Sequence, residues 1–283
     1  MSQIGAHVSI AGGLENAPKN AIEIGCEFFQ FFSKSPRGGK SKEITTEIAA
    51  NFVTECEQLG FKSWKSNIIH SAYFINLAST NNRIFYGSVS SLQQELEVAS
   101  LLKVPFVVTH IGSAKDFEGK DSRKLAKKQV EKGLTKILRG YTGRSQLLLE
   151  IAAGSGNIMG DTIDEIAYFT DRFPQLGFCM DTCHSFVAGY DLRSKKQVRS
   201  FFTKMDEKIG IEKLKVIHLN DALTEFNSKV DRHDHLGQGK IGATGLAEVI
   251  KIATKKNIPL IIETKHVKIV SDIEFAKEAR DSC

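Results

Sequence analysis

The sequence has few cysteines, and their placement is not typical of a disulfide framework. Its five cysteines are scattered over 283 residues and none forms a Cys-x-x-Cys pair. Such a set argues against a disulfide-rich secreted fold and against a zinc site built from four thiolates. We therefore expect free thiols, with Cys179 and Cys183 in the core, and a reducing, cytoplasmic setting.

Long hydrophobic runs are also missing. No stretch approaches the roughly 18 consecutive apolar residues of a membrane span. The first basic residue is Lys19, and because no apolar segment precedes it we expect no signal peptide. Together these absences predict a protein without a membrane partner.

Neither sign of charge is in large excess. Lysine and arginine number 38 against 33 acidic residues, which gives a formal net charge of +5. This excess is too weak to predict nucleic-acid binding, although it does not oppose it. The composition, 41% hydrophobic and 25% charged, is that of a globular protein, and no Pro/Gly/Ser-rich linker divides the chain. We expect a single domain over residues 1–283.

Short apolar runs recur along the whole chain. Most are nearly continuous, as are strands that are buried on both faces of a parallel sheet. The eight runs are residues 4–8, 28–32, 67–70, 106–110, 147–151, 177–181, 215–219 and 260–263. The segments between them have helical spacing: Phe85, Val89, Leu92, Leu96 and Ala99 step by four, three, four and three.

Eight strands that alternate with helices predict an α/β fold, the closed (β/α)8 TIM barrel. A unit of about 35 residues suits one strand followed by one helix. The rival architecture is an open doubly wound sheet, which usually has Gly-x-Gly-x-x-Gly after its first strand. Because Ala11-Gly12-Gly13 does not match that pattern, we favour the barrel.

Histidines and acidic residues fall at the ends of the predicted strands. In such barrels the chemistry takes place at the carboxyl ends of the strands and in the loops that follow. Seven of the eight strands bring a suitable residue there: His7, His70, His110, Glu150, Asp181, His218 and Glu263. A single strand-end histidine is usually a buried hydrogen-bonding residue, but seven such residues would face one mouth. We expect His7 to support the ligands without being one.

Two loops add further candidates. Asp181-Thr182-Cys183-His184 places a histidine three residues beyond a strand-end aspartate, and the long segment 221–242 contains Asp231-Arg232-His233. Loops of that length inside a compact domain are usually functional. An Asp-x-His spacing in an extended segment puts both side chains on the same side, which suits two ligands of one ion. We expect His235 and His266 to be exposed to solvent.

The charge of this mouth favours metal binding. Several carboxylates in one place would repel one another and become protonated without counterions. Imidazole and carboxylate ligands suit zinc, manganese or iron. The nine candidate ligands, enough for two or three ions, are His70, His110, Glu150, Asp181, His184, His218, Asp231, His233 and Glu263. Three divalent ions would leave the mouth positive, which suits binding and hydrolysis of a phosphoester.

The motifs resemble those of endonuclease IV, the zinc-dependent apurinic/apyrimidinic endonuclease of base-excision repair. The resemblance extends in order from residue 4 to about residue 265. It rests on Gly5-Ala6-His7-Val8-Ser9 with Gly12-Gly13, Asp181-Thr182-Cys183-His184, Gly189-Tyr190-Asp191-Leu192, His218-Leu219-Asn220-Asp221, Asp231-Arg232-His233, and Leu236-Gly237 with Gly239 and Ile241-Gly242.

The resemblance implies three zinc ions on a (β/α)8 barrel, one of which manganese could replace. It assigns His70 and His110 to the first zinc, Asp181, His218 and Glu263 to the second, Glu150 to both, and His184, Asp231 and His233 to the third. Glu150 would also hold the nucleophile, as the catalytic residue.

The implied partner is double-stranded DNA that contains an abasic site, and a monomer is the simplest expectation for the protein that binds it. The reaction would hydrolyse the phosphodiester 5′ to the site and leave a 3′-hydroxyl and a 5′-deoxyribose phosphate. Arg37, Tyr73 and Phe74 match positions with which the family fills the space of an extruded nucleotide.

The chain departs from the family pattern in two places. Gly38-Gly39 stand where many members have an aromatic residue, and Ile151 stands where the family usually has Asn. An apolar side chain at position 151 cannot supply the hydrogen bond that an Asn could. Neither departure removes a metal ligand.

Two other functions are compatible with a metal-binding barrel. A divalent-metal sugar isomerase or epimerase uses the same fold, but needs only about four to six ligand residues and has no use for His184 and Asp231-x-His233. A DNA-damage binding module without activity is the other, although such a module need not keep four carboxylates in one mouth.

Overall fold

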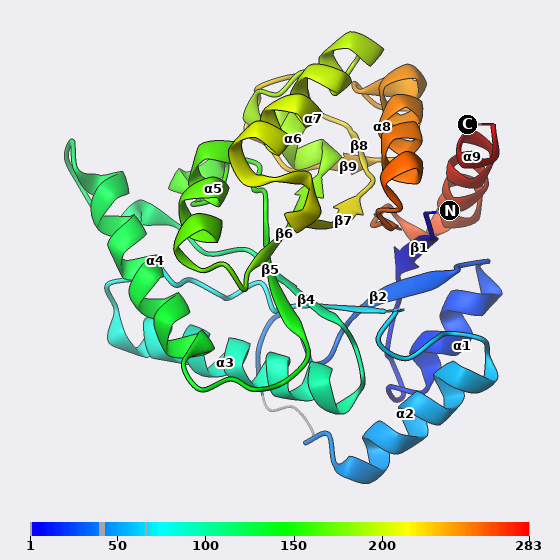
Figure 1. Cartoon of the computed structure of the whole chain (residues 1–283), viewed down its shortest axis with the longest axis horizontal. Helices are drawn as coiled ribbons and strands as arrows, with labels where there is room; N and C mark the ends of the chain where they lie inside the picture. Colours follow the sequence, from blue (N-terminus) through cyan, green and yellow to red (C-terminus); the bar gives the residue numbers. More distant parts are fainter. Residues whose placement is uncertain (1, 40–42, 66, 283) are drawn as a thin grey trace.

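Eight parallel strands form a closed barrel with helices around it in the computed structural model of the chain (Figure 1). The structure describes residues 2–39, 43–65 and 67–282. The barrel strands are β1 (Ile4–His7), β2 (Phe28–Phe32), β3 (Ile68–His70), β4 (Phe106–Thr109), β5 (Gln146–Glu150), β6 (Gly177–Asp181), β7 (Leu214–His218) and β10 (Leu260–Ile262). Because β1 pairs with both β2 and β10, the sheet closes on itself, and the predicted TIM barrel is confirmed.

Helices connect the strands and cover the outside of the barrel. They are α1 (Asn16–Glu23), α2 (Thr46–Gln58), α3 (Asn82–Leu101), α4 (Ser122–Leu138), α5 (Ile163–Arg172), α6 (Thr182–Ala188), α7 (Lys195–Ile209), α8 (Gly242–Lys256) and α9 (Ile269–Asp281). In α3 the side chain of Asn81 accepts hydrogen bonds from the N–H groups of Arg83 and Ile84 and so starts the helix. The five apolar residues with helical spacing named above are all on its buried face.

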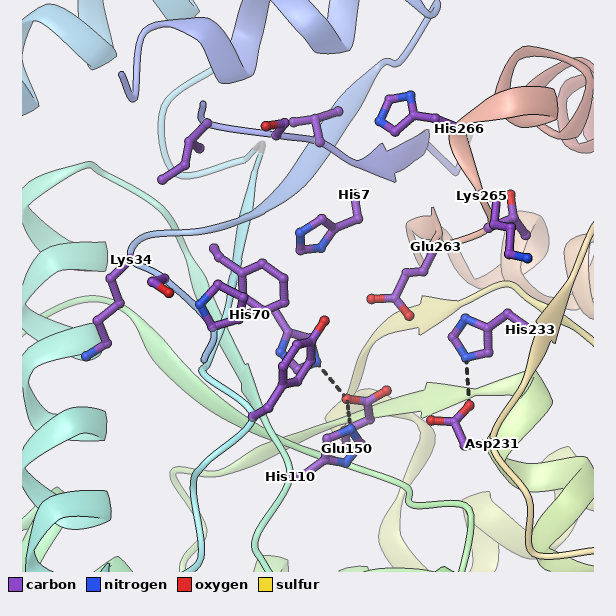
Figure 2. Close-up of a pocket in the computed structure, with 18 of the residues that line it drawn as sticks. His7, Lys34, His70, His110, Glu150, Asp231, His233, Glu263, Lys265 and His266 are labelled. Carbon is purple, nitrogen blue, oxygen red and sulfur yellow. Dashed lines mark hydrogen bonds and ion pairs between the residues drawn. The ribbon is translucent and has the colours of Figure 1, made fainter. Parts of the chain in front are cut away.

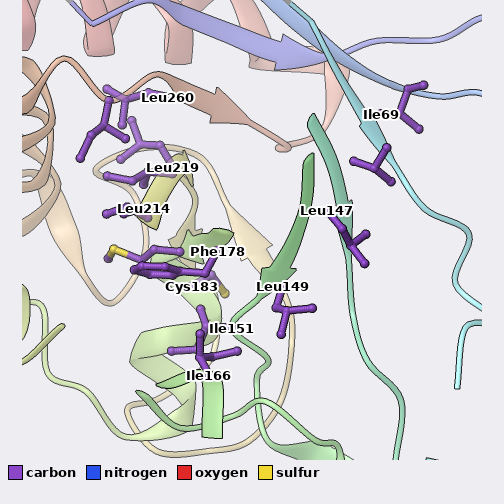
Figure 3. Close-up of a cluster of buried hydrophobic side chains, with 14 of the residues drawn as sticks. Ile69, Leu147, Leu149, Ile151, Ile166, Phe178, Cys183, Leu214, Leu219 and Leu260 are labelled. Carbon is purple, nitrogen blue, oxygen red and sulfur yellow. The ribbon is translucent and has the colours of Figure 1, made fainter. Parts of the chain in front are cut away.

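The core lies on both sides of the barrel wall. Alternate strand residues fill the interior: Phe28, Ile68, Val108, Leu148, Cys179, Val216 and Ile261. Their neighbours, including Ile69, Leu147, Leu149, Phe178, Leu214 and Leu260, belong to the larger cluster between the strands and the helices (Figure 3). Because side chains fill the barrel, it is a packed core and not a channel. Gly5 allows β1 to approach β2, since a Cβ there would lie 2.0 Å from the carbonyl oxygen of Phe28.

Cys26, Cys56, Cys179 and Cys183 are free and buried, whereas Cys283 lies outside the described residues. Across the part of the chain that the structure describes, the helices are too short or too polar to cross a membrane.

The carboxyl ends of the barrel strands meet at one mouth. His7, His70, Glu150, Asp181 and His218 are the last residues of β1, β3, β5, β6 and β7. The two other predicted strand-end residues, His110 and Glu263, come directly after β4 and β10, because these strands end one residue earlier than expected. After β7 the chain forms a small antiparallel pair, β8 (Asp221–Ala222) and β9 (His233–Asp234).

Candidate metal centre

A cleft of about 630 Å³ opens at the mouth of the barrel (Figure 2). Its lining includes His70, His110, Glu150, His184, Asp231, His233 and Glu263. Asp181 and His218 are fully buried and lie within ion-pair distance of residues in that lining. The structure therefore brings together all nine residues that the sequence analysis singled out as candidate ligands.

Glu150 lies at the centre of the group. Its Oε2 is 3.0 Å from Nε2 of His70 and 3.2 Å from Nε2 of His110. Its Oε1 is 2.9 Å from Nδ1 of His218 and 3.4 Å from Nδ1 of His184. One carboxylate at the end of β5 thus contacts imidazoles from four other segments of the mouth.

A second group of donors lies closer to solvent. Asp231 Oδ2 is 3.2 Å from Nε2 of His184, and Asp231 Oδ1 is 3.3 Å from Nε2 of His233. The same nitrogen of His233 is 3.8 Å from Oδ2 of Asp181. The side chain of Asp231 is 50% exposed, whereas that of Asp181 is buried. The Asp-x-His spacing places both side chains on the same side, as expected.

The first turn of α6 positions His184. Asp181 ends β6 and caps this helix, because its Oδ1 accepts a hydrogen bond of 2.7 Å from the backbone N–H of His184. His184 Nδ1 is 3.1 Å from the carbonyl oxygen of Ile151. Residue 151 therefore orients a candidate ligand through its backbone, and its apolar side chain does not remove that contact.

Three histidines direct one ring nitrogen at a neutral oxygen and the other at carboxylates. Besides His184, Nδ1 of His70 is 2.9 Å from the carbonyl oxygen of Ser71, and Nε2 of His218 is 2.8 Å from Oε1 of Gln30. Such an oxygen only accepts, so the ring nitrogen that faces it carries the proton. The other nitrogen of a neutral ring then points a lone pair at a carboxylate, which is unfavourable unless a proton or a cation lies between them.

The buried charges shift one another's pKa values. Burial alone would lower the pKa of His184, but Asp181 and Asp231 raise it well above its usual value. Burial alone would raise the pKa of Glu150, but the neighbouring histidines, His110 first, hold it well below its usual range. Opposed charges of this kind favour divalent ions, which bind ionised carboxylates and displace protons from histidines.

The donor atoms form several groups that could each hold an ion. Within each group they lie within 4.8 Å of one another: His70, Glu150 and His218; His110, Glu150 and His184; Asp181, Cys183 and His233; His184, Asp231 and His233; and Glu150, Asp181, His218 and Glu263. Nε2 of His233 is buried and faces Oδ1 of Asp231 at 3.3 Å, without a well-formed hydrogen bond among the described residues. A buried nitrogen that faces a carboxylate in this way fits a metal ligand. The thiol of Cys183 instead donates to the carbonyl oxygen of Arg232 at 3.6 Å, and burial raises its pKa.

Two buried amides that hold the cluster together had no role in the sequence analysis. Gln30 Nε2 donates to Oε1 of Glu263 at 2.7 Å and lies 3.1 Å from Nδ1 of His7. Asn220 Nδ2 donates to Oδ2 of Asp181 at 2.7 Å and to Oε2 of Glu263 at 3.2 Å. A polar residue inside the otherwise aromatic strand Phe28–Phe32 was the signal for Gln30. Asn220 lay unassigned within a recognised motif.

The expectation that His235 is exposed is wrong. Its side chain is 12% exposed, and its Nδ1 is 2.7 Å from Oδ2 of Asp272. The reason is tertiary: α9 contributes a buried aspartate next to this loop, which the spacing along the chain does not indicate. His266 is exposed, as expected.

Arg37, Tyr73 and Phe74 lie on neighbouring loops at the rim. Arg37 is exposed, and Tyr73 and Phe74 are 66% and 42% exposed. The N–H of Tyr73 donates to the carbonyl oxygen of Pro36 at 3.0 Å, which joins the loops after β2 and β3. Phe74 lies against Gly38, where an added Cβ would be 3.4 Å from its ring. The three predicted DNA-contacting residues are thus close together and accessible.

Comparison with known proteins decides the family. The model of the family described as "Xylose isomerase-like TIM barrel" matches residues 18–282. The probable endonuclease 4 of Cenarchaeum symbiosum is 36% identical, over 98% of this chain and 98% of its own length. The crystal structure of endonuclease IV from Thermus thermophilus has a TM-score of 0.87 at 32% identity and covers 99% of this chain and 100% of its own.

The chain belongs to the endonuclease IV family. A D-tagatose 3-epimerase-like protein is also similar, with a TM-score of 0.72, 17% identity and coverage of 99% of this chain and 97% of its own. At that identity the likeness shows the shared barrel alone. Membership of the endonuclease IV family therefore rests on the higher identity over the whole chain.

Proposed function

We propose that this member of the endonuclease IV family hydrolyses DNA at abasic sites. Double-stranded DNA is the substrate, and the phosphodiester 5′ to the abasic site is cut to leave a 3′-hydroxyl and a 5′-deoxyribose phosphate. The observation that carries the proposal is the cluster of nine histidine and carboxylate side chains at the mouth of the barrel. Full-length similarity to proteins named probable endonuclease 4 supports it.

The cluster fits three divalent ions, which we take to be zinc. As the family resemblance implies, His70 and His110 would hold the first, Asp181, His218 and Glu263 the second, Glu150 both of these, and His184, Asp231 and His233 the third. The second and third sets each form a group of adjacent donors in the structure, whereas His70 and His110 are each adjacent to Glu150 but fall in separate groups. Imidazole and carboxylate suit catalytic zinc without a thiolate, and manganese accepts the same ligands. When bound, the ions supply Lewis acidity to the phosphodiester and to the attacking water.

The chain's own side chains hold and orient the reacting groups. Glu150 lies between the ligands of the first two ions, so its carboxylate is the group placed to hold the attacking water. Gln30 and Asn220 fix both oxygens of Glu263. Lys265 lines the cleft, is exposed, and adds positive charge where a DNA phosphate would enter, whereas Lys34 is paired with Glu95 at 3.3 Å. No covalent bond between chain and substrate is needed.

Recognition of the abasic site would come from the rim. Arg37, Tyr73 and Phe74 are accessible and adjacent, so they are able to enter the duplex and occupy the space of an extruded nucleotide. Stacking of an aromatic side chain on a base contributes about 1–3 kcal/mol to the free energy of binding, which compensates for the base stacking that is lost. The proposal includes a single-domain monomer that acts in the cytoplasm.

Sugar epimerisation is the second candidate, and its support is the shared fold alone. The outer group of His184, Asp231 and His233 supplies the ligands of a third ion. A sugar site of about four to six ligands leaves that group without a role. We therefore favour the endonuclease.

Cleavage of a defined duplex tests the proposal directly. The protein is incubated with a labelled duplex that contains one abasic site, and with the same duplex without it, before and after treatment with a zinc chelator. We expect a cut 5′ to the abasic site, loss of cutting after chelation and recovery on addition of zinc. Equal cutting of both duplexes, or full activity without metal, would contradict the proposal.

A further inference from the structure

The outermost group of candidate ligands is built differently from the others. Glu150, His70 and His218 are all on barrel strands. In contrast, Asp231 and His233 come from residues 223–241, which contain only the short strand β9 outside the barrel and which we call the ligand loop, and His184 comes from a helix. The meeting of Asp231 and His233 with His184 therefore depends on how this loop is held.

One buried carboxylate, Asp221, holds both ends of the ligand loop. It is fully buried at the start of β8. Its oxygens accept five backbone N–H groups, from Ala222 at 2.8 Å, Ile241 at 2.9 Å, Gly237 at 3.0 Å, Gly239 at 3.1 Å and Gly242 at 3.2 Å. A Cβ on Gly239 would lie 2.6 Å from Oδ1 of Asp221, so the glycine allows the close approach. The glycine-rich motif after His235 thus has a structural explanation.

A second buried carboxylate, Asp272 of α9, joins the ligand loop to the loop after β10. Its Oδ1 accepts the N–H of Leu236 at 2.9 Å, and its Oδ2 is 2.7 Å from Nδ1 of His235. The hydroxyl of Thr264 donates to the same Oδ2. His235 is two residues from His233, and Thr264 is adjacent to Glu263. Asp272 therefore connects two ligand-bearing loops without being one of the grouped donors itself.

We propose that Asp221 and Asp272 are positioning residues that determine the affinity of the outermost metal site. The inference rests on the proposed function, because it takes His184, Asp231 and His233 to hold an ion. Removal of Asp272 frees the ligand loop at its middle, while the strand-borne ligands keep their positions and Glu263 remains held by Gln30 and Asn220. The affinity for the outermost ion then falls selectively, by roughly the 10- to 100-fold typical of groups that orient metal ligands.

Metal occupancy of variants tests the inference. Wild-type protein, Asp272→Ala and the control Glu248→Ala are dialysed against buffers of fixed free zinc, and the zinc per chain is measured. Glu248 is a suitable control because it is also a buried helix carboxylate. It lies on α8 and is paired at 2.6 Å with Arg199 of α7. We expect Asp272→Ala to hold about one ion fewer than wild type at limiting zinc, and to regain it in excess zinc. Glu248→Ala should behave as wild type.

A second measurement reads the loop itself. Trypsin should cut the ligand loop, at Lys229, Arg232 or Lys240, faster in Asp272→Ala than in wild type or Glu248→Ala. Asp221→Asn provides an independent variant with the same expected direction. Unchanged affinity for the outermost ion, or equal loss of all ions with an intact fold by circular dichroism, would overturn the inference. A wild-type protein that binds fewer than three ions, or does not cut abasic DNA, counts against the proposed function, and the tryptic rates then decide whether Asp272 holds the loop.

Discussion

At the scale of single residues, the site depends on carboxylates that each serve several partners. Glu150 contacts four imidazoles, whereas Asp181 both caps α6 and lies 3.8 Å from Nε2 of His233. Such shared contacts are costly to lose, because a buried partner left unpaired retains its desolvation cost. Substitution of the shared carboxylate should therefore disturb the site more than substitution of any single histidine.

Replacement of the central carboxylate is the sharpest residue-level prediction. Glu150→Gln keeps the size of the side chain but removes the charge that two ions would share. We expect the cleavage rate on abasic duplex to fall by more than the roughly 10- to 100-fold typical of groups that only orient ligands. The measurement is single-turnover cleavage at saturating enzyme, with Glu248→Gln as the matched control. Wild-type activity in Glu150→Gln would remove its assigned role.

At the scale of elements, the loops after β2 and β3 act as one unit. The hydrogen bond from Tyr73 N–H to the Pro36 carbonyl and the contact of Phe74 with Gly38 join them. Gly38 and Gly39 have φ values of 84° and 103°, in the left-handed region that glycine tolerates. The two glycines therefore allow a turn beside Arg37.

Arg37 should contribute to recognition of the lesion more than to general affinity. Arg37→Ala removes a side chain proposed to enter the duplex, so binding of abasic duplex should weaken by about 1–3 kcal/mol, with a smaller loss on intact duplex. Fluorescence anisotropy with both duplexes at one salt concentration measures this difference. Arg139→Ala, at the exposed C-terminal end of α4 and away from the mouth, is the control. An equal loss on both duplexes would mean that Arg37 contacts only the phosphate backbone.

At the scale of the whole molecule, the barrel gathers negatively charged side chains at its mouth, and positive charge must balance them in the folded protein. Four of the candidate ligands are carboxylates in one mouth, in a chain whose formal net charge is +5. Three divalent ions would add six positive charges, so the charge that DNA meets would be about +11. Metal binding is thus expected to stabilise the fold as well as to attract the substrate.

Removal of metal should lower the thermal stability. Each ion present at 100 times its Kd adds about 2.7 kcal/mol to the free energy of unfolding. In a domain of roughly this size, 1 kcal/mol corresponds to about 2–4 °C in Tm. Protein purified without chelator should contain close to three zinc ions per chain, and exhaustive chelation should lower its Tm by roughly 10 °C or more, reversibly on addition of zinc. A Tm that does not respond to chelation would contradict this coupling.

Local patterns along the chain were sufficient to predict the barrel and the candidate ligands. Apolar runs and helical spacing indicate alternating strands and helices, and parallel strands of a closed barrel bring their carboxyl ends to one mouth. Residues as far apart as His70 and His218 could thus be assigned to one site. How the site is held depends instead on tertiary contacts. Gln30, Asn220, Asp221 and Asp272 act through contacts between segments distant in the chain, and those contacts depend on strand register and on how α9 packs. No spacing along the sequence indicates that His235 meets Asp272, since the two are brought together by packing alone.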